Sequence, residues 1–170
     1  MKLDLKHVAQ EPSAVLPFDF ELDLSQVEWN GIRPFSHSIH VEGRVRNMAG
    51  AMLLNARLGS VLSLVCDRCA RPFEREKAVE YETLLAMELA NEESDDIVLL
   101  DKDGVLELDG LMQEIFLLEM DTKNLCSEDC KGLCSGCGVD LNREPCRCKK
   151  EIDPRLAKLA QLLEDQGSKE

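Results

Sequence analysis

Eight cysteines are the residues of this chain best suited to chemistry, and their spacing is typical of metal ligands. They are Cys66, Cys69, Cys126, Cys130, Cys134, Cys137, Cys146 and Cys148. A Cys-x-x-Cys turn presents two sulfurs on one side of a tight loop, and a closed structural zinc site uses four such ligands. The eight thiols therefore predict two structural zinc ions. An iron–sulfur cluster could use the same thiolates, so the choice between the two metals stays open.

The grouping of the cysteines follows from their distances along the chain. One set closes within a short segment, and we expect it to form one site: Cys134, Cys137, Cys146 and Cys148. The remaining four form a second site, in which the i, i+4 spacing of Cys126 and Cys130 places both on one side of a helical turn. In an alternative arrangement, Cys66 and Cys69 join Cys134 and Cys137 in a single ribbon-like site that holds one ion.

A redox or catalytic role for the cysteines is disfavoured. The N-terminal residues carry charges where a secretory signal is apolar, so we expect a cytoplasmic protein with reduced thiols rather than a disulfide framework. Cys66 is expected between two strands, whereas thioredoxin-like motifs begin a helix. None of the three histidines belongs to a metalloenzyme motif, and the sequence contains no phosphate-binding glycine loop or nucleophile elbow. We expect no enzymatic activity and no small-molecule substrate.

Charge is distributed unevenly along the 170 residues. The chain has 33 acidic and 20 basic side chains, which argues against coating nucleic acid by bulk electrostatics and against binding anionic membranes. No apolar run is long enough to span a bilayer, so no membrane partner is expected. Residues 91–121 contain eleven acidic side chains and one basic one, whereas residues 31–77 contain eight basic and four acidic ones.

Five arginines of the basic region are the candidate RNA-binding residues: Arg44, Arg46, Arg57, Arg68 and Arg71. The strand phases place the first three on the outer face of a sheet, and the last two project from the Cys66–Cys69 turn. Arginine binds phosphate through two parallel hydrogen bonds. Alternatively, carboxylates on neighbouring strands form cross-strand ion pairs with the same arginines.

Hydrophobic periodicity predicts an α+β fold, with an N-terminal antiparallel β-sheet meander and a C-terminal helical, cysteine-rich zinc-binding segment. Residues 1–13 carry no strong pattern, whereas period-two alternation predicts strands over about 18–24, 39–46, 54–64 and 73–87. A hairpin over 97–108, a helix capped by Asp109 and a helix beginning at Asp153-Pro154 follow. The predicted units are the sheet with its Cys-x-x-Cys knuckle (1–90), an acidic connector (91–125) and the zinc segment (126–170).

Three motifs resemble those of the bacterial YceD-like family, the large ribosomal RNA subunit accumulation proteins. They are CDRCARPF from Cys66 to Phe73, CKGLCSGCGVDLN from Cys130 to Asn142, and Cys146-Arg147-Cys148 followed by DPRL from Asp153 to Leu156. Ser135 stands where many relatives have proline, and some relatives lack the last four cysteines. The second observation favours Cys134–Cys148 as a separate staple.

The resemblance implies a role in synthesis, processing or stability of the large-subunit (23S) ribosomal RNA, without an established enzymatic activity. Genes of the family often neighbour one for a small zinc-ribbon protein of the large ribosomal subunit. Two hypotheses follow. In the first, the five arginines bind precursor ribosomal RNA. In the second, the chain is a protein–protein adaptor or chaperone whose acidic 91–121 region holds a basic ribosomal protein.

Overall fold

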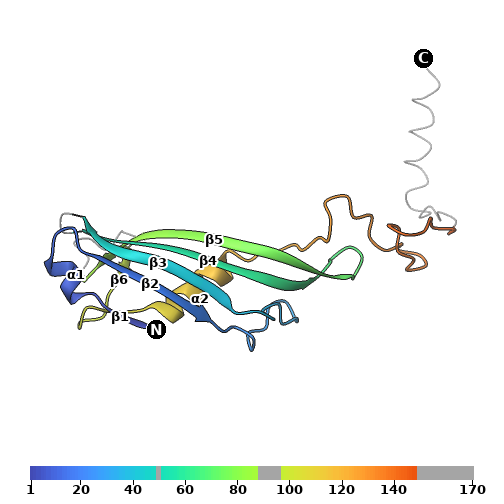
Figure 1. The fold of residues 1–170 in the computed structure, drawn as a ribbon. Helices are drawn as coiled ribbons and strands as arrows, with labels where there is room; N and C mark the ends of the chain where they lie inside the picture. Colours follow the sequence, from blue (N-terminus) through green and yellow to red (C-terminus); the bar gives the residue numbers. More distant parts are fainter. Residues whose placement is uncertain (49–50, 88–96, 149–170) are drawn as a thin grey trace, which may run out of the picture.

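A five-stranded sheet forms the body of the protein, whose computed structural model describes residues 1–48, 51–87 and 97–148 (Figure 1). Its strands, in spatial order, are β2 (Val15–Leu22), β3 (Ile39–Met48), β4 (Ala51–Val65), β5 (Pro72–Ala86) and β6 (Ile97–Leu99). Strands β2 to β5 pair antiparallel with one another, and β6 pairs in parallel with β5. The predicted antiparallel meander is therefore confirmed for β2 to β5, where alternating apolar and polar residues bury one face only.

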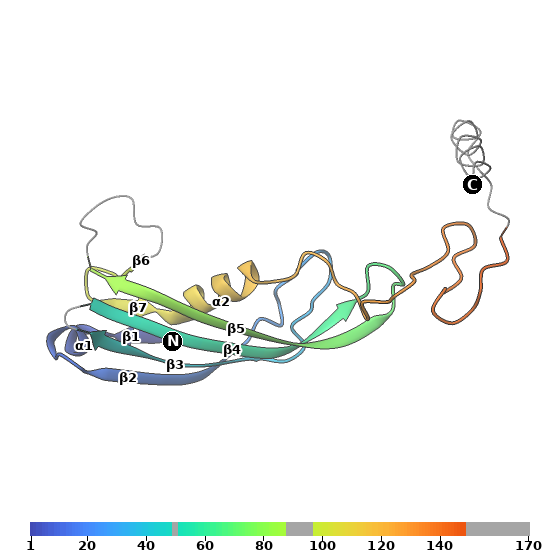
Figure 2. The ribbon, with the colours of Figure 1, turned by 90° about the horizontal axis from the view of Figure 1, so that it is seen from above.

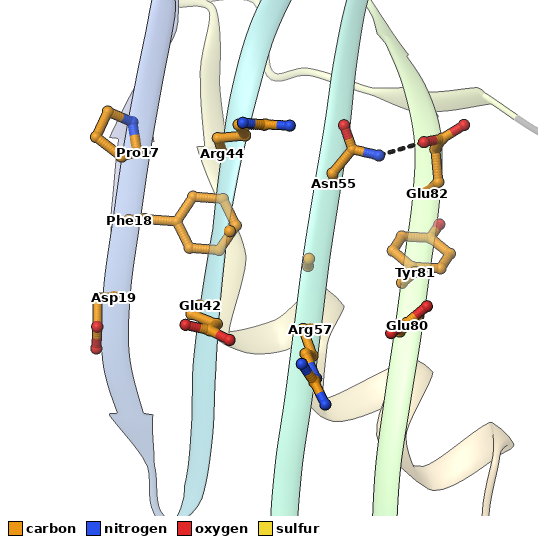
Figure 3. Close-up of a pocket in the computed structure, with 12 residues that line it drawn as sticks. Pro17, Phe18, Asp19, Glu42, Arg44, Asn55, Arg57, Glu80, Tyr81 and Glu82 are labelled. Atoms are coloured by element: carbon orange, nitrogen blue, oxygen red, sulfur yellow. Dashed lines mark hydrogen bonds between the residues drawn. The ribbon is translucent and has the colours of Figure 1, made fainter.

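The short elements lie on one side of this sheet. They are β1 (Lys2–Asp4), α1 (Lys6–Gln10), β7 (Val105–Glu107) and α2 (Leu108–Leu118). Met112 and Phe116 of α2 are fully buried with the inward side chains of the sheet, and the Phe116 ring meets Phe35 edge-on at 6.1 Å between centroids. Helix α2 lies behind the sheet when the opposite face is viewed (Figure 3). That opposite face is called the outer face.

Two expectations for the middle of the chain are wrong. Residues 97–108 do not form a hairpin, because β6 pairs in parallel with Leu84–Ala86 of β5 while β7 pairs with β1. The expected turn is present, with Gly104 at φ +68°, but the strands on its two sides diverge to different sheets. Asp109 does not cap α2, which begins at Leu108 after Glu107 and has no side-chain cap. Asp109 instead lies in the first turn.

Part of the predicted connector contributes to the core of the protein. Leu100, Leu106 and Leu108 are buried in the same cluster as Val41 and Leu58 of the sheet. After α2 the chain runs towards the turn between β4 and β5, and the cysteine-rich segment lies past that turn (Figure 2). Apolar residues of 101–121 therefore pack on the inward face of the sheet.

Helical character is not found in the part of the cysteine-rich segment that the structure describes. Residues 119–148 form turns and one isolated β-bridge between Leu133 and Asp140, and Cys126 and Cys130 are joined by a turn instead of a helix. The helix predicted to begin at Asp153 lies outside the described residues. Within the described ranges, no helix combines the length and apolar character needed to cross a membrane.

Candidate metal centres

Four cysteines meet where the β4–β5 hairpin turns. Cys66 directly follows β4 and Cys69 precedes β5, and Ala70 closes the knuckle by donating from its backbone N–H to the Cys66 carbonyl at 2.8 Å. Cys126 and Cys130 approach from the chain that leaves α2, and all four sulfurs lie within 4.8 Å of one another. We call these four residues the proximal cluster. Only Cys126 is partly exposed.

Hydrogen bonds outside the sulfurs hold the two halves of the proximal cluster together. Asp67 and Asn124 bond twice, through the Asp67 N–H to the Asn124 carbonyl at 2.9 Å and the Asn124 N–H to the Asp67 carboxylate at 2.6 Å. Arg68 Nη1 donates to the Cys130 carbonyl at 2.8 Å. The sequence analysis missed Asp67 and Asn124, because a contact between residues 57 positions apart has no local pattern.

The other four cysteines form a second group further along the chain. Cys134, Cys137, Cys146 and Cys148 also have all four sulfurs within 4.8 Å, and we call them the distal cluster. The Cys134–Cys137 turn is closed by backbone bonds from Gly138 to Cys134 at 2.9 Å and from Cys134 to Val139 at 2.8 Å. Cys137 and Cys148 are exposed, so this cluster is open to solvent where the proximal cluster is enclosed.

The structure groups the cysteines into the two sets that the sequence favoured, and not into the ribbon-like alternative. Zinc binds sulfur at about 2.3 Å, so tetrahedral ligands lie about 3.8 Å from each other. In the proximal cluster the Cys66–Cys130 and Cys69–Cys126 sulfur pairs are separated by 3.8 and 3.6 Å. In the distal cluster the sulfur of Cys146 lies 3.1 Å from that of Cys134 and 3.8 Å from that of Cys137. Both donor sets therefore have the size of a four-sulfur metal site.

Two thiols of the proximal cluster have pKa values shifted in opposite directions. Burial opposes ionisation of Cys66, but backbone N–H groups, including those of Cys126 and Cys69, outweigh it and lower the Cys66 pKa to about 6. The backbone N–H of Arg71 favours ionisation of Cys69, yet burial and the three neighbouring sulfurs raise the Cys69 pKa to about 12. A divalent cation replaces such protons when it binds.

The distal cluster has the same electrostatic character. The backbone N–H of Cys137 and the thiol of Cys146 lower the pKa of Cys134 to about 6. The side chains of Cys137 and Cys146, together with burial, raise the pKa of Cys148 to about 12. Each cluster thus contains a thiol with a lowered pKa, at which cation binding can begin, and a thiol with a raised pKa, whose proton a cation would displace.

The two clusters are joined by a short stretch of backbone. The Leu133 N–H donates to the Arg68 carbonyl at 2.9 Å, and the Leu141 N–H donates to the Gly132 carbonyl at 2.9 Å. Asn142 accepts the Lys131 N–H at 2.7 Å and points its amide at the Cys130 sulfur, 3.5 Å away. Asn142 lies in the family-like motif of residues 130–142, which is the signal by which the sequence could have identified it.

The five candidate RNA-binding arginines fall into two separate places. Arg44, Arg46 and Arg57 share the outer face, as the strand phases predict. Arg68 and Arg71 belong to the proximal cluster, where Arg68 holds the Cys130 carbonyl and Arg71 Nη2 donates to the Cys126 sulfur at 3.3 Å. That contact with Cys126 raises the Arg71 pKa above its usual value. Both guanidinium groups of the second set are therefore already engaged.

The outer face is more acidic than basic around its three arginines. In register across the strands, Arg57 lies between Glu42 of β3 and Glu80 of β5, and Asn55 donates to Glu82 (Figure 3). None of the ion pairs found among the described residues includes these arginines. The exposed carboxylates of this face outnumber the arginines by seven to three: Asp19, Glu21, Glu42, Glu74, Glu76, Glu80 and Glu82.

Comparison with known proteins identifies the family. The model of the large ribosomal RNA subunit accumulation protein YceD matches residues 54–163, which include all eight cysteines and most of the β4–β5 hairpin. The chain belongs to the YceD family. Because the match begins inside β4, it covers Arg57, Arg68 and Arg71 of the YceD chain but not Arg44 or Arg46.

Curated mycobacterial proteins are similar over nearly the whole YceD chain. Uncharacterised proteins of Mycobacterium bovis and Mycobacterium tuberculosis are 26% identical over 174 residues, which cover 96% of this chain and 81% of theirs. An uncharacterised protein of Mycobacterium leprae is 24% identical over 171 residues, or 94% of this chain and 76% of its own. No solved structure matches the YceD chain.

Proposed function

We propose that this protein supports accumulation of the large-subunit (23S) ribosomal RNA as a non-enzymatic binding factor that holds a basic protein partner. The YceD family, to which the chain belongs, is named for that accumulation. Four cysteines at each cluster would complete a tetrahedral site and leave no open position for a substrate. For that reason we propose binding rather than catalysis, in the cytoplasm where large-subunit precursors are assembled.

A protein partner is favoured by the charge of the outer face. Its carboxylates outnumber its arginines, so the field there attracts Lys and Arg side chains and repels phosphate. Residues 101–121, on the opposite side of the sheet, add further acidic side chains. Proteins that assemble onto ribosomal RNA use basic segments to neutralise its phosphates. An acidic surface can hold such segments before assembly.

Direct binding of precursor ribosomal RNA is the second candidate, and the observation favouring it is the cluster of arginines on two adjacent strands. Arg44 and Arg57 are exposed and lie on β3 and β4, close enough for neighbouring phosphates of one RNA strand. Arg68 and Arg71 would join them only by giving up their contacts in the proximal cluster.

One experiment separates the two candidates. The tagged full chain is crosslinked by ultraviolet light in growing cells, and both the RNA and the proteins that co-purify are identified with and without ribonuclease. A basic ribosomal protein retained after ribonuclease supports the adaptor. A sharp crosslink peak in large-subunit ribosomal RNA, abolished by Arg44→Glu with Arg57→Glu, would instead assign direct RNA binding.

We further propose that both clusters hold structural zinc. Elemental analysis of the freshly purified chain should give about two zinc ions, and Cys66→Ser or Cys134→Ser should each lower that number to about one. Loss of all metal from Cys66→Ser alone would support a single site. Iron with visible absorbance would assign an iron–sulfur cluster in place of zinc.

A further inference from the structure

Strand β5 has an edge that no other strand of the described residues covers. On the edge that faces the middle of the sheet, β5 pairs with β4 from Pro72 to Leu85. On its other side β6 pairs only with Leu84 to Ala86, so the backbone from Glu76 to Glu82 has no strand beside it in the described ranges. Such an edge presents alternating N–H and C=O groups that an added strand can bond.

The two edges of the sheet differ in how they can accept a strand. Strand β2, at the opposite edge, contains Pro17 as its third residue, and proline cannot donate to an added strand. Strand β5 has no proline or glycine after Pro72. Towards the proximal cluster, Asp121 pairs with Arg75 and Lys77 at 3.3 and 3.6 Å. Arg75 and Lys77 alternate with the exposed Glu74 and Glu76, so these contacts lie on the face of the strand opposite to those carboxylates.

Charge on the outer face selects what can bind this edge. Glu76, Glu80 and Glu82 are exposed and point to the outer face at alternate positions, with Glu80 and Glu82 visible along β5 in Figure 3. Alternate residues of a strand are about 7 Å apart, so an added strand with basic residues at alternate positions would face this row. A second copy of β5 would place carboxylates against carboxylates, which disfavours self-association through the edge.

A hollow lined by both apolar and polar side chains continues the edge where β6 begins. Leu53, Leu84 and Ile97 line a depression of about 500 Å³ next to Glu82, and Leu84 is 42% exposed. A partner strand that pairs with the β5 edge through its backbone would have one of its ends at this hollow. An apolar residue after the basic ones would fill it and exclude water.

We propose that the β5 edge from Glu76 to Glu82 takes up an extended, basic segment of a partner protein as an additional strand. Its Lys or Arg side chains face Glu76, Glu80 and Glu82, and an apolar residue at one end packs on Leu53 and Leu84. The inference rests on the proposed function, since it names the surface by which the chain holds a basic protein.

The test uses the full chain and a fluorescein-labelled peptide of sequence KVKVKVKVL, followed by fluorescence anisotropy at constant ionic strength. A peptide of identical composition with its lysines in one block controls for charge. A third peptide, methylated at alternate backbone nitrogens, keeps the charge but cannot form the strand. Glu76→Lys with Glu80→Lys alters the edge, and Asp19→Lys with Glu42→Lys makes the same charge change elsewhere on the outer face.

The proposal expects the alternating peptide to bind, with both control peptides and the β5 double variant weakened by about tenfold or more. The matched double variant should weaken binding by less than about threefold, through long-range electrostatics alone. Equal weakening by both double variants, indifference to methylation, or tighter binding of a labelled single-stranded RNA would each overturn the proposal. Failure of the proposed function is a separate result: deletion of the chain would leave large-subunit ribosomal RNA levels unchanged.

Discussion

Substituting alanine at Gly132 tests whether the two cysteine clusters depend on each other. Gly132 has φ +76°, and a Cβ built there lies 2.9 Å from the Arg68 carbonyl oxygen and 3.2 Å from the Arg68 Cβ. The same Arg68 carbonyl accepts the Leu133 N–H that joins the clusters. Gly138 has φ +74° in the same segment, with nothing within 4 Å of its Cβ position. Gly138→Ala is therefore a matched control for the backbone conformation.

The expected loss of stability is the sum of a backbone-conformation cost and a steric cost. A left-handed conformation costs a non-glycine residue about 1 kcal/mol, and both substitutions incur it. Forcing a methyl group into a filled space costs about 1 to 3 kcal/mol more, and only Gly132→Ala incurs this cost, because the Arg68 backbone is held by the knuckle. We expect Gly132→Ala to destabilise the segment by about 2 to 4 kcal/mol and Gly138→Ala by about 1 kcal/mol.

Metal affinity measures the difference directly. Competition of the zinc-loaded chain with a chromogenic chelator should show about tenfold or more weaker retention in Gly132→Ala than in Gly138→Ala. Fluorescence of Trp29, the single tryptophan, reports on the sheet and α2 and should not change. Equal metal affinity of the two variants would refute the reasoning, since the contact at Arg68 would then carry no energy.

Three further predictions concern the sheet, the clusters and pH. Gly43→Ala should lower stability by about 1 to 3 kcal/mol in thermal unfolding, because its Cβ meets the Asn55 carbonyl, while Gly59→Ala, whose nearest neighbour is 4.0 Å away, should be neutral or stabilising. A limiting thiol reagent should release metal from the exposed distal cluster before the buried proximal one, as followed by mass spectrometry of modified peptides. Hydrogen bonds from Ser38 and His40 lower the pKa of Glu21 below 4.5. These bonds therefore stabilise the folded protein above that pH, and the stabilisation is lost as the pH falls through the pKa of Glu21 in the folded state. NMR titration should show a higher Glu21 pKa in Ser38→Ala.

Local patterns allowed much of the metal centres and the sheet to be predicted. Spacing alone grouped Cys134 with Cys137 and with Cys146, because a knuckle fixes its own sulfurs within a few residues. Alternation of apolar and polar residues placed Arg44 and Arg57 on one face, because successive strand residues point to opposite sides of a sheet.

Contacts between distant residues could not be predicted in this way. Strands β1 and β7 have three residues each and pair across about a hundred positions, so neither has a pattern long enough to indicate its partner. The parallel pairing of β6 is equally non-local. Arg68 and Arg71 looked available for phosphate in the sequence, because their acceptors, the Cys130 carbonyl and the Cys126 sulfur, become neighbours only through the fold.

The pairing of β1 with β7 also sets an order for folding during synthesis. Leu3 pairs with Leu106, so the first strand of the chain remains without its partner until more than a hundred residues have been made. At about 5 to 20 residues per second, that interval lasts about 5 to 20 seconds. The β2–β5 meander can form meanwhile from consecutive hairpins, whereas α2 and β1 close over its inner face afterwards. Nascent chains arrested before residue 105 should therefore expose the apolar face of the sheet, and protection of that face from proteolysis at this length would contradict the order.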